Sequence, residues 1–338
     1  MSFALGEIAG GLAQSQMELA ASYRDEAARL ASAYRQLAEP TRTAIERVAA
    51  TAETVEDFER LIALEDLQAR MAAGLDDFEW QLVTSGERLQ ESAVRSALGY
   101  AETSAGAVVG WSTPNAAAVA RLVNYMDNPA LREAIGNWAG YHAEQVASLA
   151  MAGIAQGWNP RKTARAMMAY VENLPLVDAE RMMRTVQVYS YRDAVIEGWR
   201  ENSGVVRGWW WRADLGSART CMACVALHGT EHGLNETLND HHRGRCVPVP
   251  IVAGRETPGE AAGAAYFAGL DEATQIERMG RARWLAWRDG AFEFGQLVTT
   301  YEDAVYGEMR TQASLTGIVG AARAAAYTAE ARRRRPHP

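Results

Sequence analysis

The chain has 338 residues, and its apolar content of 48% is enough to build the cores of two or three domains. Its 42 acidic residues outnumber 34 basic ones, and a formal net charge of −8 argues against a general nucleic-acid coat, because such proteins are basic. Met1 to Gly11 lacks a basic segment and a long apolar core, so we expect no signal peptide. Because no apolar run approaches about 18 residues, we expect no membrane span and a soluble protein of a reducing compartment.

The first two hundred residues are predicted to be almost entirely helical. They are rich in alanine, leucine, glutamate and arginine, and apolar residues recur at three- and four-residue intervals. Pro40 is expected at a helix start, because proline is tolerated in a first helical turn. Further starts are expected where a capping residue precedes a proline: Thr113-Pro114, Asn128-Pro129 and Asn159-Pro160. We divide this part into an N-terminal helical region, residues 1–112, and a second helical region, residues 113–204.

Near residue 204 the composition changes. Val205 to Arg212 is β-branched and aromatic, which predicts a strand whose three tryptophans, Trp209 to Trp211, pack on a core. Cys246 to Val252 alternates valine with proline and predicts an extended edge segment, since proline cannot donate to a strand ladder. Residues 205–255 are therefore expected to form a small α+β module.

Helices are expected again in a C-terminal extension, residues 256–330, which includes one opened by Asp271. Residues 331–338 contain four consecutive arginines and are expected to be a basic, disordered tail that could contact DNA weakly. The chain is thus predicted to be mainly α: an elongated helical bundle, then a small zinc-stabilised α+β module, then a helical extension.

All three cysteines fall within one stretch of 26 residues. Cys221 and Cys224 form a C-x-x-C pair whose thiolates can reach one ion from a tight turn, and Cys246 ends the returning loop. One histidine would complete a Cys₃His set, which is typical of a closed structural zinc site. Three cysteines cannot pair completely as disulfides, so an oxidised framework is disfavoured. A redox C-x-x-C pair and chance clustering are the alternatives.

The spacing leaves the histidine ligand open. His241 and His242 are adjacent, so only one of them is expected to bind the same ion, while His228 and His232 lie in the same loop and could substitute. A closed four-ligand site stabilises a fold and leaves no position for a catalytic water. The sequence has no Gly-rich phosphate loop, no G-x-S-x-G and no H-E-x-x-H, so we predict no catalytic residues and no small-molecule substrate.

Two stretches of this loop carry a family resemblance. Arg219 to Gly229 has the sequence R-T-C-M-A-C-V-A-L-H-G, and His241 to Pro250 follows H-x-x-x-R-C-V-P-V-P. Together they resemble the phage Mu F-like family, the minor capsid or head-morphogenesis proteins of tailed bacteriophages. The match places His241 on the family histidine and Cys246 on its last cysteine, whereas Gly244 stands where many members have another cysteine.

The resemblance covers roughly residues 155 to 320, and it includes Arg184-Thr185, which is similar to the Arg-Thr-Glu helix of that family, with Val186 in place of glutamate. It implies a structural virion protein, not an enzyme, that binds at the portal vertex or the capsid interior and assists head assembly, DNA packaging or ejection. It also implies the portal protein and the major capsid protein as partners, and the host cytoplasm as the location during assembly.

Two other functions remain open at this point. The C-x-x-C and the adjacent histidines suggest an HNH-like metal-dependent endonuclease, but that site needs a downstream Asn and His, and only His337 follows Cys246. The second alternative is a zinc-stabilised helical adaptor without a role in a phage.

Overall fold

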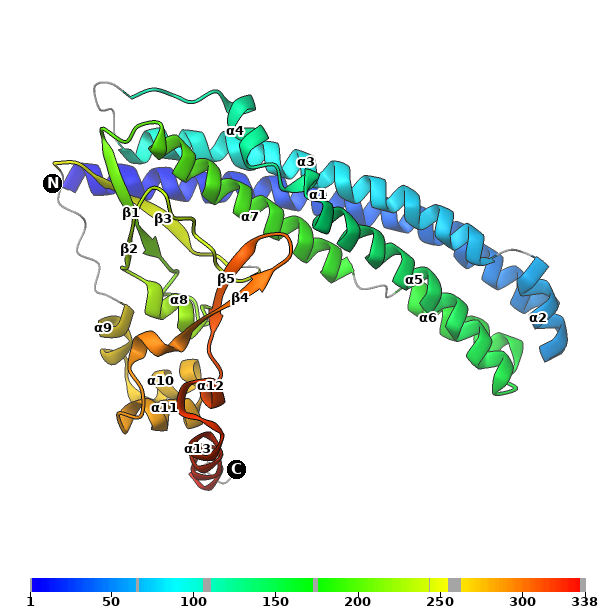
Figure 1. Cartoon of the computed structure of the whole chain (residues 1–338). Coiled ribbons are helices and arrows are strands. Elements are labelled where there is room, and N and C mark those ends of the chain that lie inside the picture. The colour runs from blue at the N-terminus through cyan, green and yellow to red at the C-terminus, as the bar shows by residue number, and fades with distance from the viewer. Residues whose placement is uncertain are drawn as a thin grey trace. The chain divides into compact units, whose positions relative to one another are not determined.

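The computed structural model describes residues 2–64, 67–105, 111–172, 176–242, 244–254 and 263–334. The protein is mainly α-helical, as the composition predicts (Figure 1). Within these ranges no helix carries an apolar stretch long enough to span a bilayer. The helices of the first part are α1 (Ser2–Thr51), α2 (Val55–Leu64), α3 (Leu67–Ala105), α4 (Ala116–Leu122), the 3₁₀ turn η1 (Tyr125–Asp127), α5 (Pro129–Ala155), α6 (Pro160–Glu172) and α7 (Leu176–Arg200).

Strands and shorter helices alternate after α7. In chain order they are β1 (Val206–Arg212), α8 (Met222–Leu227), β2 (Glu231–His232), β3 (Val247–Val252), α9 (Gly263–Ala268), α10 (Glu272–Met279), α11 (Arg281–Arg288), the 3₁₀ turn η2 (Phe294–Leu297), β4 (Val298–Asp303), β5 (Gly307–Gln312), α12 (Leu315–Val319) and α13 (Ala321–Arg333).

The chain forms two compact units, each built from segments far apart in the sequence. The first unit consists of Met1–Gln16, Ala93–Val123 and Val188–Pro338, and the second of Met17–Ser92 and Asn124–Gln187. The consecutive regions 1–112 and 113–204 predicted from the sequence are therefore not separate units. The reason is helix length, because α1, α3 and α7 each contribute one portion to each unit.

Most helix starts follow local capping chemistry. The side chains of Asn128 and Asn159 accept backbone N–H groups two residues on, both at 2.9 Å, which confirms the starts predicted ahead of Pro129 and Pro160. The start predicted at Thr113 lies two residues later, since Asn115 accepts the N–H groups of the first turn of α4.

The helix start predicted at Pro40 is wrong, because Pro40 lies inside α1. Proline removes one hydrogen bond of a helix interior, but the side chains that follow it, Thr41, Ala44 and Ile45, are almost completely buried. Their packing favours continuation of the helix across the missing bond.

The second unit is held together by side chains buried between its helices. Tyr34 of α1, Phe78 of α3 and Trp138 of α5 form a continuous aromatic group, with ring centroids 5.7 and 5.5 Å apart. The hydroxyl of Tyr34 also donates to the backbone oxygen of Val171 in α6. The helices α1, α3, α5 and α6 thus bury side chains against one another in this unit.

The sheet of the first unit has the order β2-β1-β3 and is antiparallel throughout (Figure 1). The strand predicted at Val205 to Arg212 is β1, and the predicted edge segment is β3, which pairs with it from Val206↔Val252 to Arg212↔Val247. Trp209 and Trp211 are completely buried, so these tryptophans are core residues as predicted. The indole N–H of Trp199 donates to the backbone oxygen of Ala101 at 3.4 Å, which joins α7 to α3 beside the sheet.

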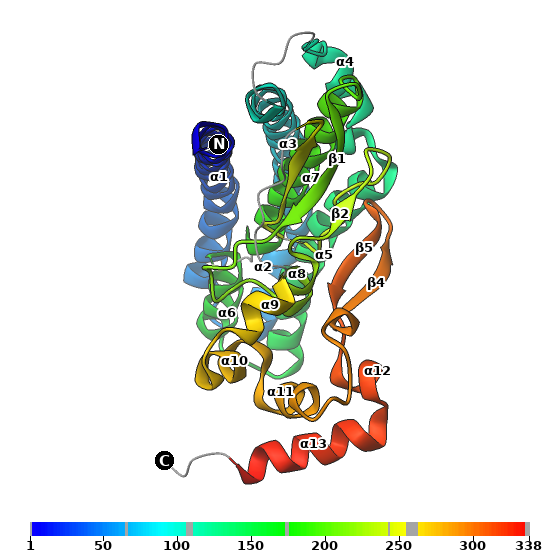
Figure 2. The same ribbon diagram turned by 90° about the vertical axis from the view of Figure 1, so that its left-hand side faces the viewer.

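The C-terminal extension, predicted as helical over residues 256–330, also contains the hairpin β4–β5, which Figure 2 shows as two strands side by side. Asp271 caps α10 as predicted, by accepting the N–H of Thr274 at 3.0 Å. Residues 255–262 lie outside the described residues. Met222 and Val225 of α8 are buried in the same core as Phe267 and Trp284, so the predicted module 205–255 shares its core with this extension.

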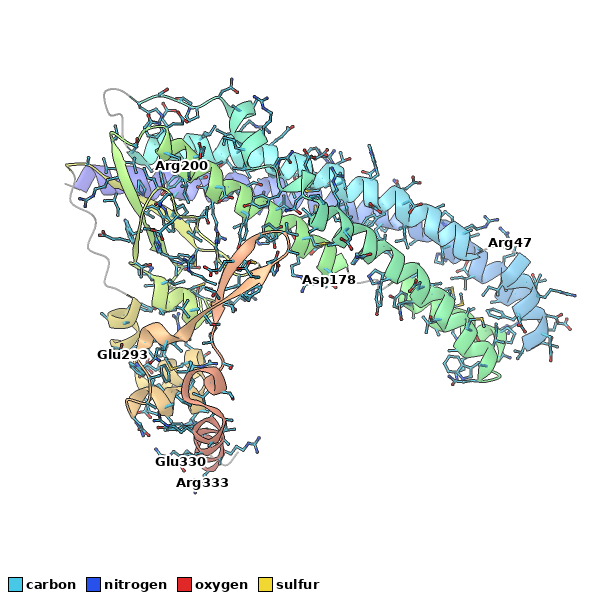
Figure 3. All side chains as sticks on the ribbon, in the orientation of Figure 1. Arg47, Asp178, Arg200, Glu293, Glu330 and Arg333 are labelled. Carbon is cyan, nitrogen blue, oxygen red and sulfur yellow. The ribbon has the colours of Figure 1, made fainter. Side chains whose placement is uncertain are left out.

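The predicted disordered tail, residues 331–338, begins inside a helix. Arg332 and Arg333 belong to the last turn of α13, where the carboxylate of Glu330 pairs with Arg333 at 2.8 Å and with Arg334 at 2.6 Å (Figure 3). Such pairs at three- and four-residue spacing stabilise helices. Residues 335–338 lie outside the described residues.

Candidate metal centre

The C-x-x-C pair lies at the start of α8. Cys221 is the N-cap of this helix, and its sulfur accepts the backbone N–H of Cys224 at 3.4 Å. This turn brings the sulfur of Cys224 to 3.3 Å from that of Cys221, and both are free thiols. Met222 and Val225 of α8 are buried in the core, while the sulfur of Cys224 contacts Asp240 and His241 in the loop that follows β2.

His241 brings a nitrogen ligand to this pair. Its Nε2 lies 3.6 Å from the sulfur of Cys224, and its Nδ1 is hydrogen-bonded to the backbone oxygen of His242 at 2.9 Å. A carbonyl oxygen only accepts, so Nδ1 carries a proton, and Nε2 is the nitrogen that faces the sulfurs and would bind a metal once it is deprotonated. This is the arrangement usual for a metal-binding histidine.

Five side chains fall into two overlapping groups that could hold a metal ion. In one group the ligand atoms of Cys221, Cys224 and His241 lie within 4.8 Å of one another, and in the other those of Cys224, Asp240 and Cys246 do. Cys224 belongs to both groups. The structure thus brings three of the four ligands predicted from the sequence, Cys221, Cys224 and His241, into one group, and it links the fourth, Cys246, to that group through Cys224, beside Asp240.

The sulfurs of Cys221 and Cys224 and the Nε2 of His241 are spaced closely enough to bind one tetrahedral ion. Zinc ligated by sulfur at 2.3 Å and by nitrogen near 2.0 Å separates two sulfurs by about 3.8 Å and a sulfur and a nitrogen by about 3.6 Å. The observed separations are 3.3 and 3.6 Å. An ion bound by Cys221, Cys224 and His241 could take its fourth ligand from Cys246 or Asp240, which share the second group with Cys224.

The electrostatics of the cluster favour negative charge at Cys221. Hydrogen bonding from Cys224, assisted by His241, lowers the pKa of Cys221 to about 5, and the same hydrogen bond raises the pKa of Cys224. Hydrogen bonding to Cys221 raises the pKa of His241 to about 9, and burial raises the pKa of Cys246. A metal ion bound here requires deprotonated Cys224 and His241, so its binding would release protons.

The other candidate histidines have different partners. His242, the reserve ligand, is paired through Nε2 with the carboxylate of Asp303 at the end of β4, 3.0 Å away. His228 accepts the N–H of Ala213 through Nδ1 at 3.1 Å. His232 stacks on Trp209 with centroids 4.3 Å apart, and its Nδ1 lies 3.0 Å from Glu236. Among the described residues, none of these three belongs to either ligand group.

Sequence reasoning missed two charged residues beside the ligands. Asp240, directly before His241, is 1% exposed and lies 3.2 Å from the sulfur of Cys224 through Oδ1. Arg192 of α7 is completely buried and forms an ion pair with Asp240 at 3.2 Å. A charged residue is almost never fully buried without a partner, and here each residue of the pair is the partner of the other. Through Asp240 the pair directly contacts the sulfur of Cys224.

In comparisons with known proteins, no family model, no curated protein and no solved structure matches this chain. The resemblance to phage head-morphogenesis proteins therefore stays a prediction based on the residues of the loop.

Proposed function

We propose that this protein is a minor capsid, or head-morphogenesis, protein of a tailed bacteriophage. In this proposal Cys221, Cys224, His241 and Cys246 bind a structural zinc ion. The observation that carries the proposal is the proximity of Cys221, Cys224 and His241, whose ligand atoms lie within 4.8 Å of one another. These are the residues that the resemblance to the family places on its cysteines and histidine.

Zinc is favoured over other ions by the donor set. Thiolate and imidazole ligands in tetrahedral arrangement are typical of zinc, whereas calcium and magnesium prefer oxygen ligands. Four protein ligands leave no position for a catalytic water, so the ion would stabilise the fold. The burial of Cys224 and Cys246 supports this structural role, because a closed site needs no access for substrate.

The zinc site is tested by elemental analysis of the purified protein before and after a thiol-modifying reagent. We expect about one zinc per chain, released when the thiols are blocked. Reduced, folded protein without zinc, and without zinc uptake at micromolar concentration, would refute the site.

The phage role is tested by co-expression with the proteins encoded beside this chain in its genome. We expect neighbouring genes for a portal protein and a major capsid protein, and co-purification of this chain with the portal protein. A zinc-stabilised adaptor without a phage role would have neither these neighbours nor this complex. Nicking of plasmid DNA with Mg²⁺, abolished in His242→Ala, would instead support the endonuclease.

A further inference from the structure

One guanidinium group holds the second half of the ligand set. Arg192, fully buried in α7, approaches Asp240 Oδ2 with Nη2 at 3.2 Å and donates from Nε to the backbone oxygen of Cys246 at 2.9 Å. The loop therefore contacts α7 at Asp240, the residue directly before His241, and at Cys246, the last cysteine. A planar guanidinium can make both bonds at once, whereas an ammonium group cannot reproduce that geometry.

A second side chain of α7 supports the same contact. The hydroxyl of Tyr189 donates to the backbone oxygen of Asp240, and the Arg192 guanidinium lies 5.5 Å from the centre of the Tyr189 ring. Asp240 in turn accepts the backbone N–H of His241 through Oδ1 at 2.8 Å. Hydrogen bonds thus connect Arg192 to the backbone of the histidine ligand through a single residue.

These bonds also indicate what Asp240 does. Its Oδ2 is engaged by Arg192 and its Oδ1 by the N–H of His241, so both oxygens have partners within the protein. Cys246 has its backbone held in the same way while its sulfur stays in the ligand group. We therefore assign Cys246 as the fourth ligand and Asp240 to orienting the loop, an assignment that the cobalt experiment in the Discussion tests.

The charges of the cluster need a buried cation. Three thiolates and Asp240 would carry four negative charges, of which a zinc ion neutralises two. Uncompensated charge is costly in a buried site. Arg192 is the charged group of α7 in contact with this set, and among the described residues no hydrogen-bond acceptor lies within reach of its Nη1. The positive charge of the guanidinium thus lies beside the cluster through its contacts with Asp240 and Cys246.

We propose that Arg192 is a positioning residue of the metal centre, which tightens zinc binding by fixing Asp240 and Cys246 and by offsetting the charge of the thiolates. The proposal rests on the proposed zinc site. Outer residues that orient metal ligands typically change metal affinity about 10- to 100-fold when they are replaced.

The test is zinc affinity, measured on the full chain by competition with a chromogenic chelator. We expect Arg192→Met to bind zinc about 10- to 100-fold more weakly, and Arg192→Lys to lie between this variant and the wild type because it keeps the charge but not the two-bond geometry. Arg192→Met combined with Asp240→Asn should recover part of the loss, since the second change removes the unpaired carboxylate. A role of Arg192 confined to its bond with the backbone oxygen of Cys246 predicts no such recovery.

Arg200 provides the matched control. It also lies on α7, its guanidinium donates to the backbone oxygen of Leu234 in the same loop at 3.0 Å, and its side chain is exposed (Figure 3). Arg200→Met should therefore leave zinc affinity unchanged.

The outcomes separate the two proposals. If the wild type binds no zinc, the zinc site is refuted and the role of Arg192 with it. If the wild type binds zinc and both Arg192→Lys and Arg192→Met bind it with wild-type affinity, only the role of Arg192 is refuted. If Arg192→Met fails to fold, the zinc affinity of Arg192→Lys is the test. An affinity equal to that of the wild type overturns the proposal, and a weaker affinity supports it.

Discussion

Gly244 and Asp240 compete for the same space: a Cβ atom on residue 244 would overlap the carboxylate of Asp240. The turn is tight, because the backbone N–H of Gly244 donates to the oxygen of His241 at 2.8 Å. In the family that the loop resembles, many members have a cysteine where Gly244 stands. The Asp240 carboxylate that pairs with Arg192 occupies the space that a side chain at position 244 would need. The buried ion pair in this position therefore requires glycine at residue 244.

Gly244→Ala should push the Asp240 carboxylate away from Arg192. Overpacking of this kind typically costs about 1–3 kcal/mol in the free energy of unfolding. The measurement is urea denaturation of four proteins: wild type, Gly244→Ala, Asp240→Ala and the double variant. Once Asp240 is alanine, we expect Gly244→Ala to cost less, because the overlap with the carboxylate is gone and only the 2.8 Å approach to the backbone oxygen of His241 remains. Equal costs in both backgrounds would contradict the proposed competition.

Cys224 should be the most sensitive ligand, because it belongs to both ligand groups. We expect Cys224→Ser to lose zinc in elemental analysis and to lose the near-ultraviolet signal of the tryptophans in β1. His242→Ala is the matched control, since this histidine is adjacent to the site but pairs with Asp303. It should retain zinc, and a loss of zinc in His242→Ala would show that the histidine ligand is wrongly assigned.

The fourth ligand can be identified by spectroscopy of the cobalt-substituted protein. Each thiolate ligand adds to the sulfur-to-cobalt charge-transfer absorption, so Cys246→Ser should reduce that band by about a third if three thiolates bind the ion. Asp240→Asn should leave the intensity of the band unchanged while the affinity decreases. The reverse pattern would make Asp240 the ligand and Cys246 a buried thiol outside the centre.

Local signals in the sequence predicted the cysteine and histidine cluster, because its residues are few, close along the chain and chemically distinctive. Arg192 was missed, although a signal for it exists. Its helix places buried residues at steps of three and four, namely Thr185, Tyr189, Arg192, Ile196 and Trp199. A charged residue within such a stripe needs a buried partner, but the sequence does not reveal that the partner is Asp240, 48 residues away.

The hairpin β4–β5 and the two units were missed for different reasons. Val298 to Tyr301 is β-branched and aromatic, and Gly307 has a φ of 70° at the start of β5, so the hairpin had a readable pattern. The units had none, because a long amphipathic helix has the same periodicity whichever neighbours cover its successive turns.

The second unit should lose stability in acid through Glu26. This carboxylate is 6% exposed on its side chain, and Arg88 binds both of its oxygens, at 2.9 and 2.8 Å. Burial alone would raise the pKa of Glu26, but the hydrogen bonds and charge of Arg88 outweigh it and hold that pKa below its usual value. The native state therefore binds this proton less readily than the unfolded chain. The stabilisation is present above about pH 4.5 and is lost as the pH falls through the native pKa.

Arg88→Met tests this linkage. This change removes the two hydrogen bonds that Arg88 donates to the buried Glu26 carboxylate. It should lower the free energy of unfolding by about 1–3 kcal/mol near neutral pH. The difference from wild type should shrink as the pH falls from 6 to 4, because protonation then relieves the variant. Arg42→Met, which breaks exposed pairs with Glu39 and Glu46 on α1, should change the unfolding curve little at any of these pH values. A constant difference between Arg88→Met and wild type would rule out titration of Glu26 as the cause.

Two glycines of α5 should respond oppositely to the same substitution. An added Cβ at Gly153 would lie 2.9 Å from the Cβ of Thr163, a residue of α6 that is 1% exposed, whereas one at Gly140 meets nothing within 4 Å. Alanine is favoured over glycine in a helix by about 0.5–1 kcal/mol, so Gly140→Ala should stabilise the protein by up to that amount.

Gly153→Ala should destabilise it by about 1–3 kcal/mol, because the close packing of α5 on α6 outweighs the same propensity gain. Thermal and urea denaturation of both variants measure the difference. In a Thr163→Ala background the contact is removed, so Gly153→Ala should become as favourable as Gly140→Ala. If Gly153→Ala stabilises the wild type as much as Gly140→Ala does, α5 and α6 do not approach each other as closely at Gly153 as the structure places them.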